Sequence, residues 1–62
     1  RDPRLLGLLG QIQARAGHLT EAVEAARQAL AVAVQLGDER LAGQLRAELQ
    51  SYESANAKRQ GR

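Results

Sequence analysis

A row of alanines in the middle of the chain constrains its fold more than any other feature of the sequence. Alanines spaced three or four residues apart lie along one side of a helix, and larger apolar residues border this row on both sides. The combined apolar arc is about 200° wide, more than one neighbouring helix covers. Because small side chains let helix axes approach closely, the row predicts a central helix packed between two others. The row comprises Ala22, Ala26, Ala29 and Ala33, and its borders are Val23, Leu30, Val32, Val34 and Leu36.

The residues before and after this segment divide the chain into helices. Asp2 and Pro3 form a typical helix start, because aspartate accepts backbone N–H groups and proline fits the first helical position. Gly17 is placed to end the first helix, since glycine adopts the left-handed turn after a helix at little cost. The sequence therefore predicts a first helix over about residues 3–16.

Two further helices follow from the same kind of signals. Either His18 or Thr20 caps the second helix. Gly37 ends it, and Asp38 caps the third helix, which fades between Tyr52 and Ala55 as the apolar pattern stops. The predicted ranges are about 19–36 and 38–54.

The first helix has a broad apolar arc of about 160°, so we expect it to contact two neighbours. Gly10 interrupts this helix at a cost of about 1 kcal/mol relative to alanine. A tight crossing with the second helix is the physical reason to tolerate a glycine there. The residues of the arc are Leu5, Leu6, Leu8, Leu9, Ile12 and Ala16.

The third helix is different, because its apolar residues fill only about 100° and the rest of its surface is polar. This pattern predicts one packed face and one solvated face, as in a helix that closes a stack. Tyr52 falls inside the apolar arc, which favours a core position over a recognition role. The arc contains Leu41, Ala42, Leu45, Leu49 and Tyr52. The fold class is thus all-α, an antiparallel helical hairpin with a third, capping helix.

Length and composition limit the classes of function. A chain of 62 residues forms one domain with a small core, so stability has to come from repetition or from a neighbour. The chain has no cysteine, which excludes disulfides and thiolate metal sites and favours a cytoplasmic origin. It has no signal peptide and no apolar run of membrane-spanning length. We interpret it as a soluble piece of a longer protein.

The last eight positions carry three of the nine basic residues and no acidic one, and they show no apolar periodicity. We therefore expect a three-helix unit over residues 1–54 and a disordered basic tail over 55–62. Lys58, Arg59 and Arg62 leave open a contact with nucleic acid or an anionic surface. Three charges without an aromatic residue favour the simpler interpretation, a solvated end.

The sequence contains no pattern typical of an active site. His18 is the only histidine and has no second ligand at metal-binding spacing. The hydroxyl-bearing residues have no base placed beside them by helical spacing. Gly7 and Gly10 form a GxxG within a helix, not in a loop after a strand, so they do not predict a phosphate site. We expect no enzyme activity, no metal and no cofactor.

Several small-residue positions together resemble the tetratricopeptide repeat, over about residues 3–34. This family has a leucine-glycine pair on its first helix, a glycine in the turn and alanines on the second helix. Asp2-Pro3 is similar to the junction between successive repeats. The resemblance implies a right-handed solenoid fragment with repeat-packing contacts through Leu6, Leu9, Gly10, Ala22, Ala26, Ala29 and Leu30.

The resemblance also implies that this segment is the last repeat and the cap of an array. A preceding repeat would cover an apolar surface of the first helix formed by Leu5, Leu8 and Ile12. When this surface is bare, it recruits a partner, so we predict that the chain self-associates as a homo-oligomer.

The concave face of such an array comes from first-helix positions turned away from the second helix. On the helical wheel these positions form a polar or small arc, which fits either a solvated face or a site for an acidic or C-terminal peptide held by arginines. We therefore predict a non-catalytic scaffold for protein–protein interaction, with a self-association element as the alternative. The concave residues are Arg4, Gly7, Gln11, Ala14 and Arg15.

Overall fold

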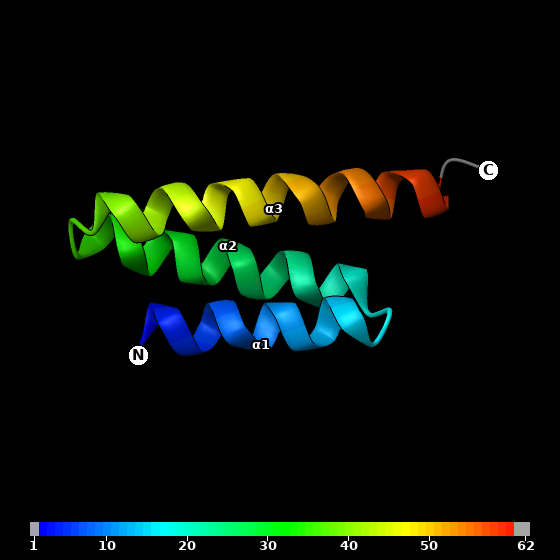
Figure 1. The fold of residues 1–62 in the computed structure, drawn as a ribbon, viewed down its shortest axis with the longest axis horizontal. Coiled ribbons are helices and arrows are strands. Elements are labelled where there is room, and N and C mark those ends of the chain that lie inside the picture. The colour runs from blue at the N-terminus through cyan, green and yellow to red at the C-terminus, as the bar shows by residue number, and fades with distance from the viewer. Residues whose placement is uncertain (1, 61–62) are drawn as a thin grey trace.

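The computed structural model describes residues 2–60, with side chains described for residues 2–58. Three helices follow one another, α1 (Pro3–Arg15), α2 (Leu19–Gln35) and α3 (Glu39–Gln60). The helix α2 lies between α1 and α3, and each helix runs antiparallel to the next (Figure 1). No strand occurs in residues 2–60, which confirms the predicted all-α class.

The ends of α1 and α2 follow from local capping chemistry. The Asp2 carboxylate accepts a hydrogen bond from the backbone N–H of Arg4 at 2.9 Å, and Pro3 is the first helical residue. Gly17 and Gly37 both have positive φ, 86° and 74°, in the turns after α1 and α2. The predicted ends of α1 and α2 are residues 16 and 36, and the observed ends are Arg15 and Gln35.

The two later helices begin differently from each other. His18 is the N-cap of α2 and makes no side-chain capping hydrogen bond, whereas Thr20 lies inside the helix. This settles the alternative left open by the sequence. At the start of α3, the Asp38 carboxylate accepts from the backbone N–H of Leu41 at 3.2 Å. The cap predicted at Asp38 is therefore present, and the cap at His18 relies on backbone groups alone.

The third helix is longer than predicted. We expected it to fade between Tyr52 and Ala55 and expected disorder over 55–62, but α3 continues to Gln60. The prediction relied on the end of the apolar pattern, whereas a helix continues as long as its residues favour it. The sequence has no glycine or proline between Gly43 and Gly61. Ala55 is also half-buried, and residues 61–62 lie outside the described residues.

The core is built mainly from alanine. Among the described residues, no large side chain is fully buried, and Leu45 is the largest core residue at 2% exposure. The alanine row predicted for the central helix is buried on α2, together with Ala25. The core residues are Ala22, Val23, Ala25, Ala26, Ala29, Ala33, Ala42 and Leu45.

The crossing of α1 and α2 is as close as the glycine in α1 suggests. A Cβ atom added at Gly10 would lie 3.4 Å from the carbonyl oxygen of Ala22 and 3.5 Å from the Cβ of Ala25. A Cβ atom there would thus be in van der Waals contact with the α2 backbone, so the two helices lie close enough at this point to admit only a small residue.

The helix α3 has the packed face and the solvated face expected for it. Ala42 and Leu45 pack on the core, and Leu41, Leu49 and Tyr52 are half-buried beside them. Burial raises the pKa of the Tyr52 hydroxyl, and the nearby Glu48 carboxylate raises it further. On the solvated side, the Nη2 atom of Arg27 in α2 pairs with Oε2 of Glu53 at 3.2 Å.

One part of the predicted apolar arc of α2 is wrong. Val34 and Leu36 were placed at its borders, but they are 57% and 66% exposed. The reason is that α2 packs closely on its neighbours through alanine. Helices packed in this way are in contact only along a narrow strip, and the side chains that flank the strip stay uncovered.

Candidate interaction surfaces

Four large aliphatic side chains are exposed together on α1, and we call this surface the outer face of α1. Each of them is three residues from one other member and four from a second, so the four share one side of the helix, away from Gly10. No charged residue belongs to this set. The exposed fractions are 65% for Leu5, 52% for Leu8, 45% for Leu9 and 57% for Ile12.

Leu9 is a correction to the sequence prediction, which assigned it to the packing between helices. The sequence prediction placed only Leu5, Leu8 and Ile12 on the exposed surface. Leu9 precedes Gly10 by one residue and so points about 100° away from the closest approach of α2. Since α2 lies directly against Gly10, it does not reach around to cover Leu9. The other predicted packing residues of α1 and α2 are buried or half-buried.

A groove lies between α1 and α3. At its floor, a Cβ atom on Gly7 would lie 3.0 Å from Cδ2 of Leu45, so the glycine makes room for that leucine. Near the middle of α3, the Nε2 atom of Gln11 donates a hydrogen bond to Oε2 of Glu48 at 2.9 Å and joins the two walls. The groove is lined by Pro3, Arg4, Gly7, Leu8, Gln11, Leu41, Gln44, Leu45 and Glu48.

Three of the five residues predicted for the concave face, Arg4, Gly7 and Gln11, line this groove. Gly7 is buried at the floor, while Arg4 is exposed and its Nε atom lies 3.9 Å from the Asp2 carboxylate. Ala14 is half-buried and Arg15 is exposed near the end of α1, and neither lines the groove.

The sequence prediction missed the contribution of α3 to this groove. Glu48 brings a carboxylate beside Gln11, so the groove carries both charges instead of the purely basic edge seen on the wheel of the first helix. The Oε1 atom of Glu48 is buried and has no hydrogen-bond partner within the described part of the chain. Positions 41, 44 and 48 share one edge of α3, and this spacing was the signal that could have identified them.

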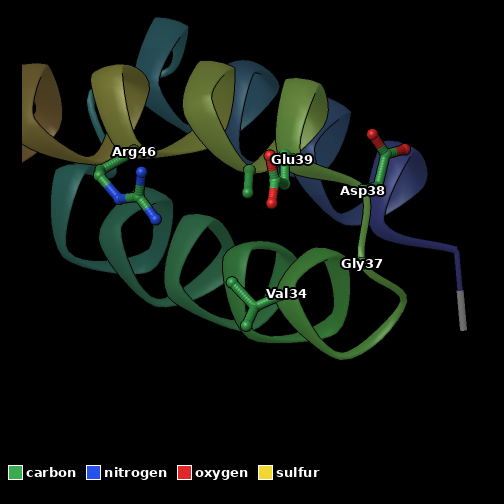
Figure 2. Close-up of a pocket in the computed structure, with 6 residues that line it drawn as sticks. Val34, Gly37, Asp38, Glu39 and Arg46 are labelled. Atoms are coloured by element: carbon green, nitrogen blue, oxygen red, sulfur yellow. The ribbon is translucent and has the colours of Figure 1, made fainter.

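A second hollow lies between the end of α2 and the start of α3, and no predicted site includes it. Figure 2 shows Glu39 and Arg46 pointing from α3 toward α2, with Val34 on the opposite wall. The floor is Ala42. The charged residues that line the hollow are two acids and one base, Asp38, Glu39 and Arg46.

The described residues show no arrangement suited to metal binding or to crossing a membrane. Within residues 2–58, no three side chains of the histidine, cysteine, aspartate or glutamate type gather to hold a metal ion. None of α1, α2 and α3 has both the length and the hydropathy that a bilayer crossing needs. Lys58 is exposed on α3, and Arg62, named for a nucleic-acid contact, lies outside the described residues.

Comparison of the chain with known protein families, with curated proteins and with solved structures gives no match in any of the three. The resemblance to the tetratricopeptide repeat therefore depends on the residues quoted for it, and the function has to be inferred from the surfaces described above.

Proposed function

We propose that this chain is a non-catalytic module for protein–protein interaction, built like the last repeat and cap of a tetratricopeptide array. One observation carries the proposal: alanines fill the core while the outer face of α1 exposes three leucines and an isoleucine. Folding normally buries the largest aliphatic side chains first. A contiguous exposed set of them is typical of a surface that another protein covers.

The two ends of the helical stack support the proposal, because they differ in chemistry. The outer face of α1 is aliphatic, whereas the far side of α3 carries exposed polar residues such as Gln50 and Ser54. In a right-handed solenoid, the apolar end packs on a preceding helix pair and the polar end faces water. We infer that α1 is the contact end of the module and α3 its solvated end.

The groove between α1 and α3 is the proposed peptide site of the module. Arg4 and Gln11 line the groove, and Arg15 lies beyond it on the same side of α1, so the three residues follow one another at intervals of seven and four. The two arginines are about 16 Å apart along the helix axis. An extended peptide of about five residues spans this distance, so an acidic segment can place a carboxylate at each arginine by charge-assisted hydrogen bonds.

The peptide proposal is tested by following backbone amide shifts of the isotope-labelled chain by NMR. Hexaglutamate with a free C-terminus is the probe, and hexalysine is its charge-reversed counterpart. We expect saturable shifts at Arg4, Gln11 and Arg15 with hexaglutamate only. Arg4→Gln should weaken binding at least about threefold, an expected loss for one exposed charge pair.

Arg46→Gln is the matched control, since it removes an exposed arginine on the opposite side of α3, beside Val34. It should leave the hexaglutamate titration unchanged. If Arg4→Gln and Arg46→Gln weaken hexaglutamate binding equally, binding depends only on the net charge of the chain. The groove would then not be the site.

Self-association is a second candidate function, favoured by the same exposed face of α1. Replacing Leu5 and Ile12 by polar residues separates the two functions, because both are exposed on α1 and neither lines the groove. If the face serves self-association, oligomers disappear in this variant. If the groove serves peptide capture, hexaglutamate binding persists, because the arginines that hold it remain in place.

A further inference from the structure

We propose that Glu48 makes the groove between α1 and α3 select a peptide in which one basic residue stands between two acidic residues. This inference rests on the proposed peptide site and adds the order of charges that the site recognises. Among the described residues that line the groove, Glu48 is the only one with a carboxylate, so it is the specificity-determining residue.

The negative charge of Glu48 has no counter-ion within the described part of the fold. Its Oε2 atom accepts a hydrogen bond from Gln11 at 2.9 Å, but the Gln11 amide is neutral and leaves the charge uncompensated. Across residues 2–58, no lysine or arginine forms an ion pair with Glu48, whereas Glu53 on the same helix is paired with Arg27 at 3.2 Å. Glu48 is therefore able to pair with a cation that a ligand brings.

The surroundings of Glu48 strengthen its attraction for such a cation. The side chain is half-buried, and its Oε1 atom is buried with no hydrogen-bond partner among the described residues. A polar atom left in this state costs free energy. Charges also attract each other more strongly where water is partly excluded. A basic side chain that enters the groove thus gains more at Glu48 than at a fully exposed carboxylate.

The hydrogen bond between Gln11 and Glu48 fixes where along the groove this carboxylate lies. Gln11 comes seven residues after Arg4 and four residues before Arg15, which corresponds to about 10 Å and about 6 Å along α1. Glu48 is level with Gln11. Because an extended peptide advances about 3.3 Å per residue, the peptide residue at Glu48 stands three residues from the one at Arg4 and two from the one at Arg15.

Charge complementarity then gives the order of residues in the peptide. An acidic residue pairs with each arginine, and a basic residue pairs with Glu48 between them. Gly7 and Leu45 form the floor between Arg4 and Glu48, so small apolar residues suit the positions between the charges. A fully acidic peptide also reaches both arginines, but it places a like charge beside Glu48.

Two capped hexapeptides of identical composition test this order by the same NMR titration. The matching peptide reads glutamate, alanine, alanine, lysine, alanine, glutamate. The control peptide reads glutamate, alanine, glutamate, alanine, alanine, lysine. In the first the lysine stands between the acids whichever way the peptide lies, and in the second it stands at one end. We expect the matching peptide to bind at least about threefold more tightly, as one partly exposed charge pair allows.

Glu48→Gln and Glu53→Gln are a matched pair of variants, because each removes one negative charge from α3 and keeps the size of the side chain. Glu48→Gln should abolish the preference for the matching peptide and strengthen hexaglutamate binding about threefold. Glu53→Gln should keep the preference, since Glu53 does not line the groove. The comparison of the two hexapeptides on the wild-type chain needs no variant, so it holds even if Glu48→Gln impairs folding.

The outcomes separate this inference from the proposed function. If hexaglutamate binds at Arg4 and Gln11 but the two hexapeptides bind equally, the charge order is wrong and the acidic-peptide site stands. A preference that Glu48→Gln and Glu53→Gln reduce equally would also overturn the role of Glu48. If none of the three peptides binds, the groove is not a peptide site, and the inference and the proposed peptide site fail together.

Discussion

Gly10 and Ala22 bring the backbones of α1 and α2 close together, since a Cβ atom at Gly10 would be in van der Waals contact with the Ala22 carbonyl oxygen at 3.4 Å. This closeness explains both the alanine core and the exposed aliphatic residues. Helices that approach on glycine and alanine have little space between them for leucine. The larger side chains of α1 are therefore left on its outer face.

The glycines of this chain should respond oppositely to substitution. Gly43 is exposed on α3, and a Cβ atom there would have no neighbour within 4 Å. Gly43→Ala should raise the free energy of unfolding by about 1 kcal/mol through helix propensity. Gly10→Val should lower it by about 1–3 kcal/mol, because the added carbons meet the α2 backbone. Urea unfolding of both variants measures this difference, and a stabilised Gly10→Val would contradict the close crossing.

Leu45 should be the most sensitive large residue of the core. It is 2% exposed and fills the space beneath Gly7. Leu45→Ala should cost about 2–5 kcal/mol of unfolding free energy through lost burial and the cavity left behind. Leu5→Ala is the control, because Leu5 is 65% exposed. At concentrations where the chain is monomeric, it should change stability by less than about 0.5 kcal/mol, and equal losses in thermal unfolding would contradict this core.

Replacing the N-cap residues Asp2 and His18 by alanine should lower the free energy of unfolding by different amounts. Asp2→Ala removes the acceptor that bonds the Arg4 backbone N–H and should cost about 1 kcal/mol. His18→Ala should cost much less, because the His18 side chain makes no capping hydrogen bond. Chemical unfolding followed by circular dichroism measures both changes. A larger loss in His18→Ala than in Asp2→Ala would show that the two caps are wrongly assigned.

Tyr52 should make stability depend on pH at the alkaline end. It is the only tyrosine, and its pKa is raised above 10.0 by burial and then by the Glu48 carboxylate. Below the unfolded pKa both states keep the proton, so Tyr52 has no effect on the pH dependence of unfolding there. Above it the unfolded chain loses its proton first, so the free energy of unfolding should fall as pH rises from about 10 until the folded pKa is passed.

Two variants isolate this effect. Tyr52→Phe should remove the tyrosine contribution to the alkaline decline. Glu48→Gln should move the phenol titration, followed by ultraviolet absorbance, to lower pH, though burial will keep part of the shift. An unchanged titration in Glu48→Gln would show that the carboxylate does not act on Tyr52.

Local chemistry made much of the fold predictable from sequence. Asp2, Gly17 and Gly37 act through their own backbone neighbours, so the starts and ends of α1 and α2 could be placed to within about one residue. The last turns of α3 were missed for a local reason as well. The prediction followed the apolar pattern and gave too little weight to residues that sustain a helix without packing.

The candidate sites were less predictable, because each depends on two helices at once. The wheel of α1 identified Arg4 and Gln11 but contained no information about Glu48, which enters the groove from α3. The exposure of Leu9 depends on how much of the α1 surface is covered by α2. That coverage cannot be read from the sequence of either helix alone.

The sequence by itself determined three helices, the caps at Asp2 and Asp38, and the alanine side on which the central helix packs, because these follow from interactions within a few residues. Only the tertiary structure decided that Leu9, Val34 and Leu36 are exposed as well, and which polar groups meet in the groove. The physical reason is that α1 and α2 lie close together at Gly10. They pack along a narrow strip of small residues, and the outer face of α1 stays uncovered.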